Sequence, residues 1–133
     1  FEEEWCQIKD CDSIENLQHE RAAFKEMLTH CVEFGLRGGA IVVDGTIRAV
    51  ALAGELNPQT LVMHILKADS RITGLYQTML HEFLKGEAHS YPYINLEQDL
   101  GVEGLRKAKM SYHPCALVSC YSLCQNSVKD NPG

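Results

Sequence analysis

The dipeptide Asp44-Gly45 restricts the fold more than any other feature, because it separates two β-prone runs at 38–43 and 46–53. A type I′ turn needs positive φ at both central residues, and Asp-Gly is one of its preferred sequences. The two runs are therefore expected to form an antiparallel hairpin. Small side chains alternate along the second run and would leave one face open to close helix packing: Ala49, Ala51 and Ala53.

Apolar residues that recur at three- and four-residue steps predict two amphipathic helices. The first spans about 16–34, and Gly35 follows it at the position where a glycine commonly ends a helix. The second begins after Arg71 and ends near Gly86. Residues 60–66 lie between the hairpin and this second helix, and their β-branched, apolar character predicts a third strand.

Three further elements complete the chain. Residues 91–95 predict a short strand, 102–112 predict a helix that Pro114 stops, and 115–121 predict a last strand. A hairpin followed by alternating strands and helices predicts an α/β (α+β) fold with a mixed central sheet flanked by helices. Neighbouring strands separate where antiparallel pairing changes to parallel pairing, and ligands tend to bind at such points.

The length, charge and composition of the chain limit its organisation and its partners. A length of 133 residues predicts a single domain over 1–133, with an N-terminal extension at 1–12 and a flexible tail at 125–133. The net charge of −6 argues against binding of duplex nucleic acid. No run of 18 apolar residues occurs, so no transmembrane segment is expected. The acidic N-terminus lacks the order of a signal peptide, which favours a cytoplasmic protein, and the absence of an initiator Met suggests a piece of a longer chain.

The six cysteines are expected to be free thiols, because the chain is long enough to fold without disulfides and shows no secretory signal. The last three are spaced C-x4-C-x3-C, which does not match a CxxC zinc knuckle. We therefore expect no metal site. The cysteines are Cys6, Cys11, Cys31, Cys115, Cys120 and Cys124.

Polar residues at alternating positions follow the strand at 91–95. Asn95, Glu97 and Asp99 would point the same way in an extended segment, and could bind an amine or orient a nucleophile. Asp99 has a second interpretation, as a helix cap that accepts amides near Gly101. For Glu97 the catalytic and the structural interpretations remain open.

The helix predicted at 102–112 carries the next candidates. Gly101 and Gly104 weaken its first turn, which suggests that either a helix or a ligand comes close there. Arg106 and Lys109 share a face and could hold phosphate groups of a nucleotide cofactor or of a tRNA end, although cations near a helix C-terminus are also favourable in themselves. Tyr112 could donate a proton to a leaving group or simply pack at the surface.

Two further candidates lie in and after the strand at 60–66. His64 is either a core histidine or a member of a site at the strand separation. Arg71 and Gly74 precede the second helix, whose N-terminal amides could hold a pyrophosphate. The sequence lacks the fingerprints of serine hydrolases, P-loop NTPases, zinc peptidases and dinucleotide oxidoreductases, so these classes are disfavoured.

Three segments of the chain resemble the phosphatidylglycerol lysyltransferase C-terminal domain family: 60–69, 74–77 and 93–114. The likeness extends over about 34–121. It implies a GNAT-like acyl-CoA N-acyltransferase fold, of which this chain looks like the second of two tandem halves. A second GNAT-like domain is therefore an expected partner in the parent chain. Characterised relatives move an aminoacyl group from aminoacyl-tRNA to a lipid head group.

The resemblance implies an acyl or aminoacyl transferase with a small-molecule, lipid or peptide acceptor. Its candidate catalytic residues are Glu97 as base, Tyr112 as acid, and His64. Its candidate donor-binding residues are Arg71, Gly74, Asn95, Arg106 and Lys109.

The donor implied is aminoacyl-tRNA or acetyl-CoA. The pyrophosphate loop of GNAT enzymes reads Q/R-x-x-G-x-G/A, and Tyr76 stands at its last position here, which favours a donor other than acetyl-CoA. Leu66 and Leu96 replace charges that relatives often carry. The alternatives to an aminoacyltransferase are an acetyl-CoA-dependent N-acetyltransferase and a catalytically silent GNAT-like module that binds a ligand or partner.

Overall fold

The structure is a computed structural model that describes residues 15–87 and 89–123 of the chain. The extension predicted at 1–12 and the tail predicted at 125–133 lie outside the described residues. The chain divides into two compact units, 1–98 and 99–133. The first unit contains helices α2 (Glu15–Thr29) and α3 (Leu75–Glu87) and strands β1 (Arg37–Val43), β2 (Thr46–Asn57), β3 (Thr60–Ala68) and β4 (Tyr93–Asn95). The second contains α4 (Glu103–Met110).

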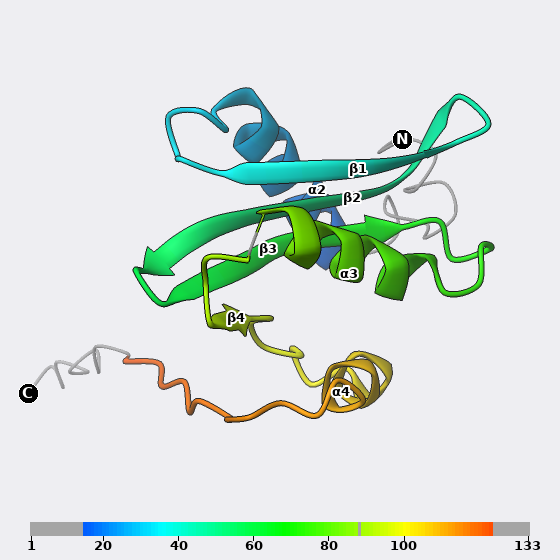
Figure 1. Cartoon of the computed structure of the whole chain (residues 1–133). Helices are drawn as coiled ribbons and strands as arrows, with labels where there is room; N and C mark the ends of the chain where they lie inside the picture. The colour runs from blue at the N-terminus through cyan, green and yellow to red at the C-terminus, as the bar shows by residue number, and fades with distance from the viewer. Residues whose placement is uncertain (1–14, 88, 124–133) are drawn as a thin grey trace, which may run out of the picture. The chain divides into compact units, whose positions relative to one another are not determined.

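The four strands form one mixed sheet in the order β1-β2-β3-β4 (Figure 1). β1 pairs antiparallel with β2, and β2 pairs antiparallel with β3. β4 pairs parallel with β3 over three residue pairs, from Thr60↔Tyr93 to Val62↔Asn95. The α+β class and the mixed sheet flanked by helices are thus as predicted, and the change from antiparallel to parallel pairing falls at β3. This arrangement is consistent with a GNAT-like fold.

The turn between β1 and β2 has the predicted geometry. Asp44 has a φ of 51° and Gly45 a φ of 74°. Both values lie in the left-handed region that a type I′ turn requires at its two central positions. The local sequence therefore fixes the start of the sheet.

One face of the sheet packs against α3. The alanines of β2 are fully buried on this face, together with Leu61 and Met63 of β3. Their partners on α3 are Leu75, Met79, Leu80 and Phe83. Small residues bring the helix close: a Cβ added at Gly39 of β1 would lie 3.3 Å from Met79 Cε and from a Phe83 ring carbon. The predicted close packing over Ala49, Ala51 and Ala53 is confirmed.

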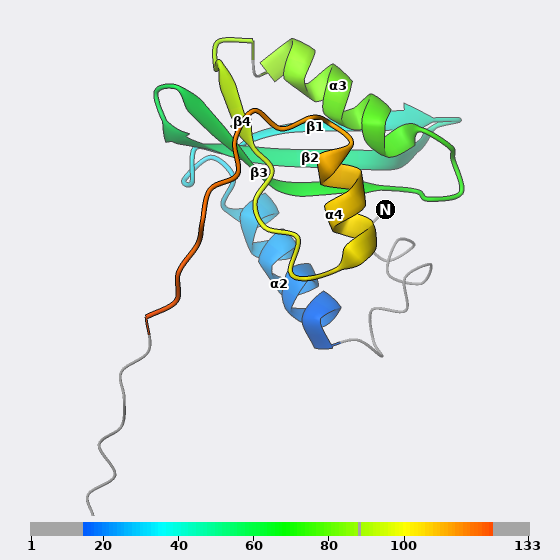
Figure 2. The same ribbon diagram turned by 90° about the horizontal axis from the view of Figure 1, so that it is seen from below.

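The opposite face packs against α2, and Figure 2 shows the two helices on opposite sides of the sheet. Phe24 of α2 is buried with Leu52 of β2 and Ile65 of β3. Burial on both faces explains why β3 reads as a nearly continuous apolar run rather than as an alternating one.

The first helix ends earlier than the sequence predicts, at Thr29 instead of residue 34, and turns occupy residues 30–35. The predicted role of Gly35 is nevertheless confirmed. Gly35, with a φ of 62°, donates its N–H to Val32 O, and the Leu36 N–H donates to Cys31 O. These two bonds form a Schellman motif, which only a residue tolerant of positive φ closes without strain.

Irregularities in strand pairing give one strand of a pair an extra residue. Leu52 pairs with Ile65 and Ala53 with Met63, so His64 is an extra residue in β3. Ile41 pairs with Ala49 and Val42 with Ile47, so Arg48 is an extra residue in β2. Such bulges bend a strand and re-aim the side chain of the extra residue.

The second unit differs from the prediction in two ways. Residues 115–121 form no strand and are exposed, because β-prone residues form a strand only beside a backbone partner, and the described residues offer none. Gly101 lies before the helix rather than in its first turn, with a φ of 77° that suits glycine. Gly104 does lie in the first turn, where a Cβ would meet nothing within 4 Å.

The buried position of Phe83 predicts a large effect of Phe83→Ala. Phe83 is 3% exposed, and its loss should lower the free energy of unfolding by about 3–5 kcal/mol, because a cavity replaces a ring that packs on the sheet. Phe34→Ala removes the same side chain from a site that is 54% exposed, and should cost about 1 kcal/mol or less. Urea unfolding of both variants checks this, and equal losses would contradict the assigned core.

Candidate functional site

His64 and Glu97 meet just beyond the last residue pair of β3 and β4. His64 Nδ1 lies 2.9 Å from Glu97 Oε1. The pairing of β3 with β4 ends at Val62 and Asn95, and each member of the pair lies two residues further on. The two side chains are 31% and 44% exposed, so the pair is accessible to solvent. The structure thus brings together two of the three candidate catalytic residues at the predicted strand separation.

Asn95 lies next to this pair. Its side-chain oxygen accepts the backbone N–H of Glu97 at 2.7 Å. Ile94 and Leu96 pack against the core on the α3 side of the sheet, so Asn95, which lies between them, points to the other side. The segment is not extended at Glu97, which has a φ of 58°, so the alternation predicted from Asn95 to Asp99 does not continue there. The amide oxygen of Asn95 is therefore engaged in shaping the site, while its role in donor binding stays a prediction.

Gly54 of β2 makes room for the imidazole ring. A Cβ at this position would lie 3.1 Å from His64 Nε2 and 3.1 Å from Leu36 Cδ2. Gly54 alternates with Leu52 along β2, which places the His64 ring on the α2 face of the sheet. The sequence analysis missed Gly54, because its role depends on a neighbouring strand.

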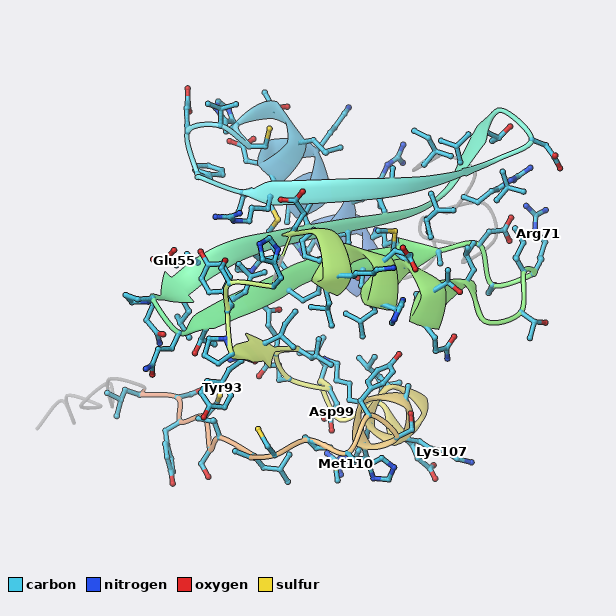
Figure 3. The ribbon with its side chains drawn as sticks, in the orientation of Figure 1. Glu55, Arg71, Tyr93, Asp99, Lys107 and Met110 are labelled. Carbon is cyan, nitrogen blue, oxygen red and sulfur yellow. The ribbon has the colours of Figure 1, made fainter. Side chains whose placement is uncertain are left out.

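Arg71 lies in the turn between β3 and α3, as Figure 3 shows, and is bound to Asp69. Arg71 Nε and Nη2 donate to the two carboxylate oxygens of Asp69 at 2.8 and 2.6 Å, and Arg48 Nη1 lies 3.3 Å from Oδ2. The hydrogen bond from the Arg71 side chain lowers the pKa of Asp69 from 3.8 to about 2. Arg71 thus holds a buried carboxylate, and its proposed contact with a donor phosphate would compete with that bond.

Gly74 directly precedes α3 and has a φ of 79°, and a Cβ added there would meet no atom within 4 Å. Its carbonyl accepts the Thr78 N–H at 2.9 Å. Tyr76 is half-buried and packs against the α3 core cluster. Its side chain therefore contributes to the core, and the crowding of a pyrophosphate by Tyr76 stays a prediction from the sequence.

The remaining candidates belong to the second unit. Arg106 donates to both carboxylate oxygens of Asp99, at 2.5 Å from Nε and 3.2 Å from Nη2. This bond lowers the pKa of Asp99 to about 2 and raises the pKa of Arg106. Asp99 Oδ1 also accepts the Gly101 N–H at 2.9 Å, while Val102 takes the N-cap position without a side-chain bond. Asp99 is therefore a turn former and ion-pair partner rather than the N-cap.

Lys109 and Tyr112 lie at the C-terminal end of α4. Lys109 lies in the last turn of the helix, and its carbonyl accepts the Tyr112 N–H at 3.2 Å. Tyr112 is 38% exposed. Donor binding by Arg106 and Lys109, and proton donation by Tyr112, stay predictions from the sequence.

The sequence analysis also missed a buried cation. Lys67 of β3 is 1% exposed; its ammonium lies 3.2 Å from Glu20 Oε1 on α2 and 5.3 Å from the centre of the Phe24 ring. The feature of the sequence that could have indicated this residue is a lysine near the end of a mostly apolar strand. The pair ties α2 to the sheet on the same face as His64. Removal of Glu20, whose side chain is exposed, would take this carboxylate away from a buried ammonium, which is costly.

Three of the cysteines lie in the described part of the chain, and they are free: Cys31, Cys115 and Cys120. Within residues 15–87 and 89–123, no group of three or more His, Cys, Asp or Glu side chains is placed to hold a metal ion. None of the described helices combines the length and the apolar character needed to cross a membrane.

The chemistry of the His64–Glu97 pair follows from its geometry. An ionised carboxylate only accepts hydrogen bonds, so Nδ1 of a neutral imidazole must donate to Glu97. The second ring nitrogen, Nε2, then carries a lone pair and can accept a proton. A carboxylate that orients a histidine in this way also stabilises the imidazolium ion once it forms.

The ion pair at Asp69 predicts a pH dependence of stability. Because the folded-state pKa of about 2 lies below the ordinary 3.8, ionised Asp69 stabilises the folded state above about pH 4, and this contribution is lost as pH falls towards 2. Asp69→Asn should therefore lower the Tm at neutral pH, and its difference from the unsubstituted protein should shrink between pH 4 and 2. Asp44→Asn, in the exposed hairpin turn, should show no such convergence in calorimetry. A constant difference for Asp69→Asn would contradict the assignment.

Comparison with known proteins places the chain in a family. A crystal structure of a conserved protein of unknown function from Bacteroides thetaiotaomicron VPI-5482 matches with a TM-score of 0.83 and 41% sequence identity. The match covers 87% of this chain and only 39% of that protein. No curated protein matches. The family model for the C-terminal region of phosphatidylglycerol lysyltransferase matches residues 1–124, and the chain therefore belongs to this family.

Proposed function

We propose that the chain is an acyl or aminoacyl transfer domain in which the His64–Glu97 pair moves the proton of the attacking group. The observation that carries the proposal is the 2.9 Å contact between His64 Nδ1 and Glu97 Oε1, at the place where β3 and β4 stop pairing. Family membership supports the class of reaction.

The reaction is nucleophilic attack on a carbonyl carbon. The amine or hydroxyl of the acceptor forms a bond to this carbon, and the bond from the carbonyl to the oxygen of an aminoacyl-tRNA ester breaks. The proton of the acceptor passes to His64 Nε2, and then to the departing oxygen, so that the protein returns to its first state.

The proposed role of Glu97 differs from that of the base first predicted. Its contact with His64 Nδ1 supports a role in orienting the ring and stabilising the imidazolium ion, and in the proposal His64 accepts the proton. The two residues thus act as a unit, and removal of either should have a similar effect. Tyr112 as a proton donor stays a prediction from the sequence.

The donor and the acceptor follow from the family and are part of the proposal. Members are named for lysine transfer to phosphatidylglycerol, which favours an aminoacyl-tRNA donor and an acceptor with a lipid head group. Acetyl-CoA is the second donor to test, because the sequence at Arg71 and Gly74 partly matches its binding loop, although Arg71 is engaged by Asp69. A membrane-bound or soluble acceptor is distinguished by supplying lipid vesicles or a free amine.

Variants of the pair test the proposal. His64→Gln and Glu97→Gln should each lower kcat by about 10²-fold or more, because proton transfer in the transition state is lost. The assay follows transfer of a labelled aminoacyl group from charged tRNA to phosphatidylglycerol vesicles, with labelled acetyl-CoA as the alternative donor. Folding of each variant is checked by its Tm.

A matched control lies on α3. His81 Nδ1 lies 3.0 Å from Glu82 Oε1, and the His81 side chain is 71% exposed. His81→Gln removes the same kind of contact from the surface and should leave kcat unchanged. An unchanged rate in His64→Gln would remove His64 from the mechanism. Absence of transfer from either donor in the unsubstituted protein would favour a silent binding module.

A further inference from the structure

The backbone at Glu97 is held in an uncommon conformation. Its φ is 58°, in the left-handed region that non-glycine residues rarely adopt. The N–H of the same residue donates to Asn95 Oδ1 at 2.7 Å, which closes a turn from a side chain to the backbone two residues on. We propose that Asn95 is a positioning residue, which holds Glu97 in this conformation and so aims its carboxylate at His64.

Asn95 joins the end of β4 to the segment that carries Glu97. Asn95 is the last residue of β4 to pair with β3, and Leu96 packs into the core on the α3 side. The bond to Asn95 offsets the cost of the positive φ at Glu97, because an extended or helical backbone is lower in energy for glutamate, and its loss should favour one of those conformations. The carboxylate would then leave the imidazole.

The imidazole itself is confined on its other side. His64 is the extra residue of the β3 bulge, and its ring lies over Gly54, where a Cβ would approach Nε2 to 3.1 Å. The position of the ring is therefore fixed, and the Glu97 carboxylate must be directed towards it. The bulge determines the position of His64 and the bond to Asn95 that of Glu97, so the contact between the two residues depends on both features.

The effect of Asn95 on catalysis rests on the proposed function, whereas its effect on the ring of His64 does not. In the neutral imidazole, donation from Nδ1 to Glu97 favours the Nδ1–H tautomer. A free imidazole does not have this constraint. The tautomer of His64 therefore reports whether Glu97 is in place, independently of any substrate.

The experiment measures the tautomer by ¹⁵N NMR of the histidine ring nitrogens, with His64→Gln used to assign the signals. Asn95→Ala should lose the preference for Nδ1–H, as should Glu97→Ala, which removes the acceptor oxygen itself. Asn95→Asp and Asn95→Ser keep an acceptor oxygen at this position and should restore the preference, fully or in part. An unchanged tautomer in Asn95→Ala would overturn the proposal, as would failure of both conservative variants to restore it.

A matched control exists in the same unit. Asn57 Oδ1 accepts the Gln59 N–H at 2.9 Å, which is the same kind of side-chain-to-backbone bond at the β2–β3 connection, although Gln59 does not have a positive φ. Asn57→Ala removes an equivalent bond and should leave the His64 tautomer as it is. A similar change in both variants would show a general loss of structure and would overturn the specific role of Asn95.

Kinetics supply a second readout. Asn95→Ala should lower kcat by about tenfold to a hundredfold with little change in KM, because misplacement of a proton-transfer group acts on the transition state. A rise in KM alone would contradict a positioning role. If the protein transfers no acyl group at all, the proposed function fails, while the tautomer measurement still decides whether Asn95 positions Glu97.

Discussion

The antiparallel pairing of β2 with β3 is the interaction on which the rest of the first unit depends. Its register places Ala49, Ala51 and Ala53 on the α3 face and Leu52 with Ile65 on the α2 face. A slip of one residue would exchange the two faces, exposing the apolar set that each helix covers. The register also contains the bulge at His64, so the same pairing that builds the core sets the position of the candidate base.

The two buried charged residues in the described part of the sheet and its connections are each matched by specific partners. Asp69 is held by Arg71 and Arg48, and Lys67 lies beside Glu20 and the ring of Phe24. A buried carboxylate or ammonium is costly unless it is paired in this way. Arg48 and His64 are both extra residues at bulges, and both contact a carboxylate that follows a strand end. The bulge at Arg48 thus places a structural ion-pair partner of Asp69, and the bulge at His64 places, in our proposal, the proton acceptor of the reaction.

Local sequence predicted much of the fold, because its signals act over a few residues. The Asp44-Gly45 turn, the glycine that ends the first helical segment, and the alanine face of β2 all followed from short patterns. The strand predicted at 115–121 did not form, because a strand depends on a partner that composition cannot supply. Gly101 was placed in a helix on spacing alone, although its positive φ belongs to the preceding turn.

The sequence by itself determined the order of elements up to the helix at Glu103–Met110, the mixed sheet, the family, and His64, Asn95 and Glu97 as candidates. Only the tertiary structure decided how these three residues are related, because the contact of His64 with Glu97 joins positions 33 residues apart. It also showed that Arg71 and Arg106 are each bound to an aspartate, which no count of charges reveals. Periodicity and turn chemistry are local properties, whereas the partner of a side chain depends on which strands lie side by side.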